Sequence, residues 1–113
     1  MYGLAAALNF AAVLAHFERS PTEVARLASD LIELSTRQNF AQWLAGGKLY
    51  RGWARSASGY PAEGIASIED AIGYYRAIGS TQGMPFSLAL KAEALHLADR
   101  PSEALAAALS TNA

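Results

Sequence analysis

Apolar residues recur at intervals of three and four along three stretches of the chain, a pattern typical of helices that bury one face. In the stretch after Pro21 these residues are Val24, Leu27, Ala28, Leu31 and Leu34. In the stretch after Pro61 they are Ile65, Ile68, Ala71, Ile72, Tyr75 and Ile78. After Pro101 they are Ala104, Leu105, Ala108 and Leu109. The pattern therefore predicts three amphipathic helices, each beginning at a proline.

The three predicted helices share a start signal that repeats every forty residues. A proline stands at the same position in each, and a glutamate follows two residues later: Pro21, Pro61 and Pro101, then Glu23, Glu63 and Glu103. Proline suits the first helical position because the N–H that it lacks would have no partner there. The carboxylate lies near the positive end of the helix. Ser20 and Glu23 also match a capping box, in which each side chain bonds the other residue's N–H.

A second helix, longer and richer in small residues, precedes each proline. We expect these helices over about residues 2–18, 40–58 and 84–98. Ala12, Gly52 and Ala92 occupy equivalent places, where a small side chain lets the paired helix approach closely. Gly79 fits a helix C-terminal cap followed by a loop over 80–83. The expected fold is all-α, with six helices in three antiparallel pairs and repeats over about 1–38, 39–79 and 80–113 of a single domain.

Composition narrows the range of functions. Of the 113 residues 52% are hydrophobic and only 17% are charged, so we expect much of the surface to be buried or covered by a partner. The net charge of −1 offers no general attraction for nucleic acid or anionic lipid, and we expect neither as a direct partner. The chain contains no cysteine, which excludes structural disulfides and thiolate metal sites.

The first residues raise the question of a targeting segment. Residues 3–15 resemble the apolar core of a signal peptide, but no Lys or Arg precedes them and the chain continues directly into the next helix start. The stretch is also too short to span a bilayer. We therefore expect a buried first helix and a cytoplasmic protein.

In a pattern of the tetratricopeptide superfamily, a small residue is followed seven residues later by glycine and then by x-x-x-Glu-Ala. This chain matches that pattern with Gly52, Gly59, Glu63 and Gly64. The chain therefore resembles this superfamily, and the resemblance implies a right-handed array of helix pairs whose groove binds a peptide, a helix or a neighbouring domain. More narrowly, the chain is similar to the C-terminal repeats of large bacterial signalling and transcription regulators, which carry a cyclase, kinase or LuxR-type DNA-binding domain and an ATPase module. The segments that carry this likeness are 41–45, 51–54, 64–66 and 85–89.

The chain also departs from the tetratricopeptide pattern. Its period is forty residues rather than about thirty-four, so its helices are longer. Lys48 and Leu88 stand where the family has a large aromatic residue early in the first helix of a pair. No cyclase, ATPase or DNA-binding segment lies in the chain, so we expect a fragment of a longer protein, with no enzyme activity and no cofactor. The two ends are expected to expose apolar helix faces that an internal repeat would cover.

The two histidines, His16 and His96, lie eighty residues apart, with Ser56 midway between them. On stacked equivalent helices these three residues predict a polar column on the concave face, where repeat arrays usually bind. The alternative is that each histidine ends its helix and caps carbonyl groups or faces water. The separation of two repeats is too long for both histidines to bind one metal ion, and no metal site is expected.

Lys48, Arg51 and Arg55 are spaced to share one face of a helix. They predict a basic strip for an acidic peptide, carboxylate or phosphate, or else a solvated face, or an Arg51 paired with a carboxylate such as Glu63 or Asp70. Their repeat position favours the packing side, whereas their charge favours water. The neighbouring segment Gly46-Gly47-Lys48 lacks the other residues of a phosphate-binding loop, so we expect it to make a close helix contact.

Trp53 is the aromatic residue most expected to bind a partner, because it follows the small position Gly52 and a half-exposed tryptophan is a common anchor. The other aromatic residues are more typical of a core. Counting from the small position of each repeat in the same way also places Asn9 and Glu93 in the groove, together with Val13, Leu49 and Ala89. The leading hypothesis is a protein-interaction module, with self-association or small-molecule sensing through Arg51 as alternatives.

Overall fold

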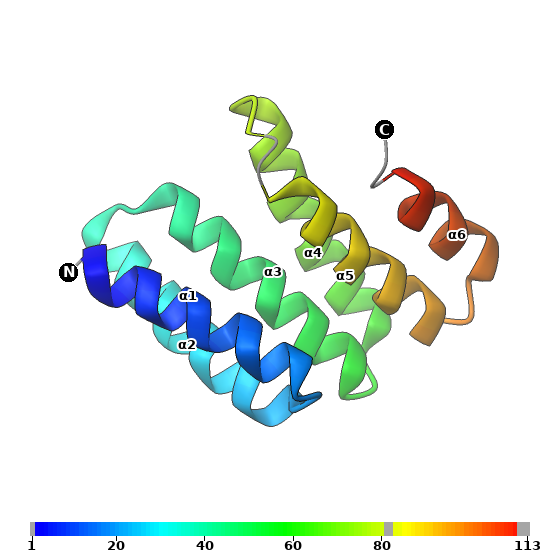
Figure 1. The fold of residues 1–113 in the computed structure, drawn as a ribbon, viewed down its shortest axis with the longest axis horizontal. Coiled ribbons are helices and arrows are strands. Elements are labelled where there is room, and N and C mark those ends of the chain that lie inside the picture. The colour runs from blue at the N-terminus through cyan, green and yellow to red at the C-terminus, as the bar shows by residue number, and fades with distance from the viewer. Residues whose placement is uncertain (1, 81–82, 111–113) are drawn as a thin grey trace.

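The computed structural model describes residues 2–80 and 83–110, which form six α-helices joined by short turns (Figure 1). The helices are α1 (Tyr2–Phe17), α2 (Pro21–Gln38), α3 (Ala41–Ala57), α4 (Pro61–Ala77), α5 (Met84–Leu97) and α6 (Pro101–Ser110). The predicted all-helical fold and its six helices are therefore confirmed. Residues 81 and 82 of the predicted 80–83 loop, and the last three residues of the predicted third repeat, lie outside the described residues.

The forty-residue period is present in the backbone as well as in the sequence. Within the described residues, positive φ angles occur at Arg19 (58°), Gly59 (102°) and Asp99 (60°), and again at Asn39 (57°) and Gly79 (72°). The chain thus adopts the left-handed conformation every twenty residues, just after each helix. This conformation ends a helix by letting the following N–H groups bond back to its last carbonyls. Equivalent bonds run from Ser20 to Ala15 O, from Tyr60 to Arg55 O and from Arg100 to Leu95 O, at 2.9–3.1 Å.

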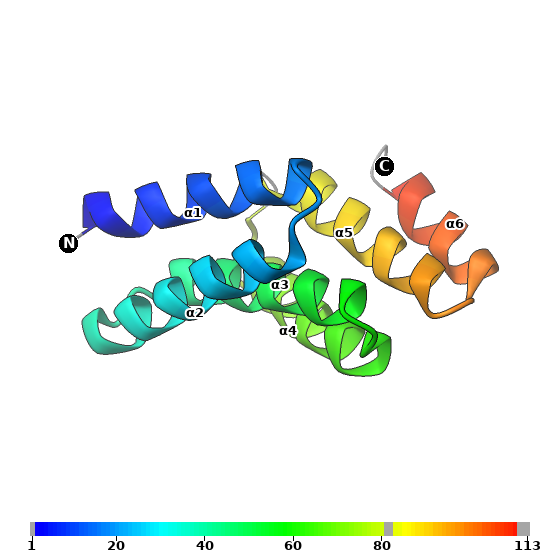
Figure 2. The ribbon, with the colours of Figure 1, turned by 90° about the horizontal axis from the view of Figure 1, so that it is seen from below.

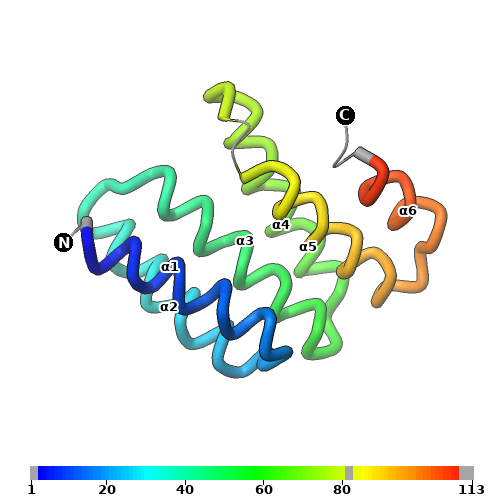
Figure 3. The backbone as a smooth tube through the Cα atoms, in the orientation of Figure 1, coloured from blue at the N-terminus to red at the C-terminus, as the bar shows by residue number. Residues whose placement is uncertain are grey.

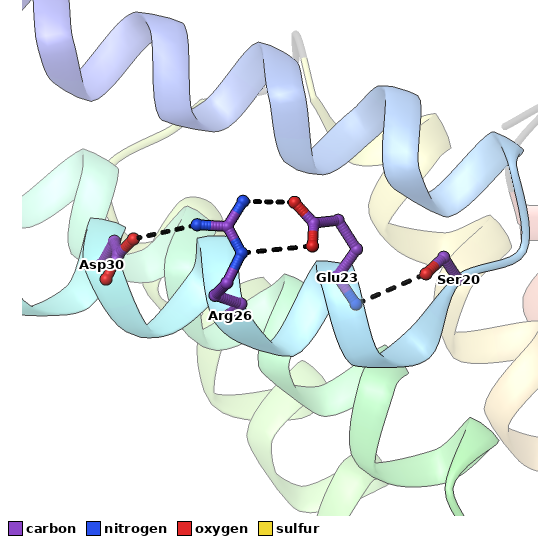
Figure 4. A network of polar contacts seen from close by, with 4 residues as sticks. All are labelled: Ser20, Glu23, Arg26 and Asp30. Carbon is purple, nitrogen blue, oxygen red and sulfur yellow. Dashed lines mark hydrogen bonds and ion pairs between the residues drawn. The ribbon is translucent and has the colours of Figure 1, made fainter.

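The predicted helix starts are confirmed at all three prolines, each of which is the first residue of its helix. The capping box is only half formed (Figure 4). The backbone N–H of Glu23 donates to Ser20 Oγ at 3.4 Å, but the Glu23 carboxylate pairs with Arg26 instead of bonding back to Ser20. Arg26 also lies 3.8 Å from Asp30 one turn further on. The N–H of Ser20, which the glutamate would accept in a complete box, donates to Ala15 O at 3.1 Å instead.

Each helix packs against the next one along the chain, and α3 also contacts both α1 and α5. The tube in Figure 3 shows that α1, α3 and α5 run in roughly the same direction, with α2 and α4 returning between them. Figure 2 shows α1 and α5 on one side of the molecule and α2, α3 and α4 on the other. The helices α1 and α5 therefore lie over the same face of α3, which makes that face concave.

Glycines allow two of these helix contacts to be very close. A Cβ built on Gly64 of α4 would lie 2.4 Å from the carbonyl oxygen of Gly52 in α3 and 2.0 Å from Ser56 Oγ. A Cβ on Gly47 would lie 2.6 Å from Ile32 Cγ1 in α2. Side chains at these positions would push the helices apart, because contacts below 3.0 Å require atoms to move. The predicted close-contact roles of Gly52 and of the Gly46-Gly47 pair are confirmed.

The predicted core faces are confirmed in α2 and in most of α4. All five apolar residues of the α2 stripe are buried, as are Ile65, Ile68, Ala71 and Ile72 of α4. Ile78 was predicted to be buried, but it follows the end of α4 and is 50% exposed. In α6 the predicted face is confirmed only at Ala104, which packs against the core; Leu105 and Leu109 are exposed, and Ala107, which was not predicted, is buried. The alanines of α6 pack against α5, which rotates the leucines away from the core.

The prediction of a buried first helix is also only partly right. Ala5, Ala12 and Ala15 of α1 are buried, but the opposite face exposes large apolar side chains. Phe10 and Phe17 are exposed to 65% and 67%. None of the helices in the described part of the chain is long and apolar enough to cross a membrane.

Candidate binding groove

An apolar groove of about 620 Å³ lies where the C-terminal ends of α1, α3 and α5 meet α6. Its lining comes from the α1–α2 turn, from the first residue of α2 and from α3, α5 and α6: Arg19, Pro21, Trp53, Ala57, Ala92, Glu93, His96, Leu97, Ala104, Leu105 and Ala108. Leu97 and Leu105 are 51% and 61% exposed, so two leucines face the open side of the groove. Small side chains at Ala57, Ala92 and Ala104 leave room between the helices.

A polar bridge from α1 to α5 forms one wall of this groove. His16 Nε2 lies 2.8 Å from Glu93 Oε2, and Arg19 donates to the other oxygen of the same carboxylate. In the described chain, no Cα atom of α1 lies within 8 Å of one in α5, so side chains alone join these helices. Burial raises the pKa of Glu93, but the hydrogen bonds from His16 and Arg19 outweigh it, and the pKa lies below its usual value. Glu93 is therefore an ionised acceptor that holds two helices together.

Aromatic rings lie beneath this bridge. The His16 ring packs edge-on against Trp53, with centroids 4.6 Å apart, and against Phe86 at 5.5 Å. Trp53 is only 3% exposed, so the prediction of a half-exposed anchor is wrong. Its helix face does point toward the concave side, as the repeat position predicted, but α1 and α5 converge over it and cover the ring. Trp53 forms the floor of the groove rather than a protruding contact.

The predicted polar column of His16, Ser56 and His96 is not formed. His16 is buried and bonds Glu93, and His96 is exposed at the edge of the groove. Ser56 is buried at the contact of α3 with α4, where its hydroxyl donates to the Gly52 carbonyl at 3.0 Å. A serine that bonds the preceding turn of its own helix is a common arrangement in helices. The structure thus brings His16, Trp53, Glu93 and His96 together and places Ser56 elsewhere.

Asn9 lies further along the concave side, in a separate recess of about 290 Å³. Its side-chain oxygen accepts a 2.7 Å hydrogen bond from the Tyr50 hydroxyl. Burial raises the pKa of Tyr50, so this hydroxyl stays protonated and serves as a donor. Asn9 therefore ties α1 to α3, and the recess is lined by Trp43, Tyr75 and Phe86 among others.

The basic residues predicted as a strip lie on the opposite side of α3 from Trp53. All three side chains, Lys48, Arg51 and Arg55, are exposed to solvent. Their charge therefore predicted their environment correctly, and their repeat position, which favoured the packing side, did not. Arg55, rather than the predicted Arg51, faces Glu63, at 3.9 Å, and its guanidinium lies 5.9 Å from the centre of the Tyr60 ring. Arg51 lines a recess between α2 and α3, away from the groove. The candidate site residues Lys48 and Arg51 therefore do not join the other predicted residues.

Several groove residues escaped the sequence analysis. Leu105 was assigned to the core, and Leu97, Ala57 and Ala108 were not considered as site residues. Arg19 was not considered either, although its side chain pairs with Glu93. The periodic position of Leu105 carried no information on its exposure, because that depends on how α6 rotates against α5.

In the described part of the chain, no group of three His, Asp or Glu side chains could hold a metal ion. The groove instead offers an apolar surface with one bridged carboxylate and one histidine at its edge. Such a surface is suited to burying apolar side chains of another molecule. Comparison of the chain with models of known protein families, with characterised proteins and with solved structures gave no match.

Proposed function

We propose that the chain is a tetratricopeptide-like protein-interaction module and that its groove binds the apolar face of a helical segment from a protein partner. The observation that carries this proposal is the 620 Å³ groove with two half-exposed leucines on its open side. An apolar surface of this kind is favourable to cover, because each square ångström removed from water contributes about 25 cal/mol. The setting in a bacterial signalling or transcription regulator rests on the sequence resemblance alone.

The helix-array part of the proposal is supported by two features of the fold. Left-handed turns recur every twenty residues, and each helix packs against its successor. Arrays of this kind bind ligands on the concave surface made by the first helix of each pair. Here that surface consists of α1, α3 and α5, and α3 and α5 contribute six of the groove residues: Trp53, Ala57, Ala92, Glu93, His96 and Leu97.

A protein segment fits the groove better than a small polar molecule does. Small-molecule sites usually contain several polar groups that converge on the ligand. In this groove the Glu93 carboxylate is already bonded by His16 and Arg19, and His96 lies at the edge. Apolar side chains at helical spacing would fill the space between Leu97 and Leu105 without needing polar partners. Peptide binding through such a groove follows the helix-in-groove mode.

The expected affinity is modest. Burying about 400 Å² of apolar surface, counted over the peptide and the groove together, would contribute about 10 kcal/mol before association costs. Loss of rotational freedom and side-chain ordering offset most of this gain, so a dissociation constant in the micromolar range is expected.

Selection of helical peptides from a displayed library, with the full chain immobilised, tests the proposal. Leu105→Gln and Leu109→Gln make a matched pair, because both leucines lie on α6 with exposures of 61% and 62% but only Leu105 lines the groove. We expect selected peptides to bind the Leu105→Gln chain about tenfold more weakly, the effect of losing roughly 1.4 kcal/mol of apolar contact. The Leu109→Gln chain should bind them as the unchanged protein does.

Two results would refute the groove assignment. One is the absence of any enriched peptide after several rounds of selection with the correctly folded chain. The other is a set of peptides whose affinity falls equally with both substitutions, or only with Leu109→Gln. Circular dichroism of both variants would verify that the helices are intact.

A further inference from the structure

An apolar stripe runs along the whole outer face of α1, separate from the groove. Its members follow one another at steps of four and three residues, so they share one helix face, and all are exposed: Gly3, Ala7, Phe10, Leu14 and Phe17. Phe10, Leu14 and Phe17 are 65%, 49% and 67% exposed, and the adjacent Leu4 is 51% exposed. Figure 2 shows α1 along one edge of the molecule, so its outer face is open.

The stripe is comparable in area to the largest apolar patches of monomeric proteins. With whole side-chain areas on the order of 200 Å² for phenylalanine and somewhat less for leucine, Leu4, Phe10, Leu14 and Phe17 present roughly 500 Å² of apolar surface. Contiguous apolar patches of this size are at the upper end of those found on monomeric proteins and are often interaction sites. Residues 2–17 also contain no Asp, Glu, Lys or Arg that would keep the helix solvated.

We propose that this stripe is a homodimer interface, in which α1 of one chain packs antiparallel against α1 of a second copy. The stripe has small residues at its N-terminal end, Gly3 and Ala7, and large ones in the rest of its length, Phe10, Leu14 and Phe17. A two-fold axis at Phe10 places Gly3 of one copy opposite Phe17 of the other, and Ala7 within one residue of the level of Leu14, the nearest member of the stripe. The two Phe10 side chains then meet at the axis, and on either side of it a large residue faces a small one, which is the self-complementarity that a two-fold interface requires.

The area is sufficient for a weak but specific dimer. Two copies would bury roughly 1,000 Å² through these side chains, which is close to the lower limit of biological interfaces. A core depleted of charged residues is also typical of such interfaces. A dissociation constant on the order of micromolar is therefore expected.

Sedimentation equilibrium of the full chain, from about 1 to 200 μM, tests the proposal. The apparent mass should rise from 12.0 kDa toward twice that value and no further. Phe10→Lys, which places two like charges at the two-fold axis, should weaken dimerisation at least a hundredfold, whereas Leu109→Lys on α6 should have no effect. A chain that stays monomeric, a mass that grows beyond a dimer, or a dimer lost with Leu109→Lys but not with Phe10→Lys would overturn the proposal.

A size exchange tests the antiparallel register without relying on loss of the fold. Ala7→Leu and Leu14→Ala should each weaken the dimer about tenfold, and the double variant should restore it, because a large residue again faces a small one. If apolar area alone drove association, Ala7→Leu would strengthen the dimer, and this result would contradict the pairing.

Cross-linking gives an independent measure of orientation, because the natural chain has no cysteine. Disulfides form only between residues whose Cα atoms approach within about 7 Å. Gly3→Cys and Phe17→Cys chains should form a mixed disulfide when combined and none when oxidised separately. Efficient cross-linking of each variant with itself would indicate parallel helices and refute the proposed arrangement.

Discussion

Replacement of Gly64 by alanine tests how closely α3 and α4 pack. The added Cβ would lie 2.0 Å from Ser56 Oγ, 2.4 Å from Gly52 O and 2.9 Å from Ser56 N. Two of these atoms belong to the backbone of α3, so a side-chain rotation cannot relieve the clash and α4 must move away. Overpacking of this kind costs about 3 kcal/mol, and the better helix propensity of alanine returns about 1 kcal/mol. We expect a net loss of about 2 kcal/mol in the free energy of unfolding.

Gly73→Ala is the matched control, because Gly73 lies in the same helix and no described atom would lie within 4 Å of its Cβ. Here only the helix propensity changes, so we expect a gain of about 0.5–1 kcal/mol. The two variants should therefore differ by about 3 kcal/mol, or roughly 10 °C in Tm. Urea and thermal unfolding followed by circular dichroism measure both values. If Gly64→Ala is as stable as Gly73→Ala, the α3–α4 contact is looser than described and the reasoning fails.

Four further substitutions test the buried tryptophan, the polar bridge and the turns. Trp53→Ala should lower the free energy of unfolding by about 3–4 kcal/mol, because the ring is buried. A change under about 1 kcal/mol in urea unfolding would show that the ring is not buried. The pKa of Glu93 is lowered from 4.5 in the folded chain, so its carboxylate stabilises the fold above that pH and the contribution is lost as the pH falls. The unchanged protein should therefore be more stable than Glu93→Gln at about pH 7 but approach it by about pH 3, and a pH-independent difference would rule out the bridge. Asp99→Gly should stabilise the chain by about 1 kcal/mol, because glycine adopts the positive φ of 60° without strain. Gly59→Ala, at a φ of 102°, should destabilise the chain by at least as much. Thermal unfolding measures both variants, and changes of the same sign would refute the role of these two turns.

The helices and their pairing could be predicted because their signals are local. A proline and a glutamate in the first turn determine where α2, α4 and α6 begin, and these signals act within a few residues. Small residues such as Gly52 marked a close contact, because few other side chains fit between two touching helix backbones. The α2 stripe was equally clear, since α2 packs one apolar face against α1 and α3.

The groove could be predicted only in part, because its shape depends on how the helices curve over one another. The repeat position placed Trp53 on the concave side correctly, but its burial follows from the convergence of α1 and α5, which share no local sequence signal. Glu93 and His16 were both candidates, yet their pairing joins residues 77 positions apart. Similarly, the exposure of Leu105 follows from the rotation of α6 on its buried Ala107. Such tertiary angles are not encoded in the spacing of apolar residues.

A nuclear magnetic resonance titration tests the central claim, that the apolar groove is the binding surface, most directly. The isotopically labelled chain would be titrated with a peptide selected against it, and shifts of the amide, indole and alanine methyl signals would be mapped on the structure. We predict that the largest shifts occur at Trp53, Ala92, Leu97 and Leu105, which line the groove. Shifts concentrated on Lys48, Arg51 and Arg55, on the opposite side of α3, would contradict the account.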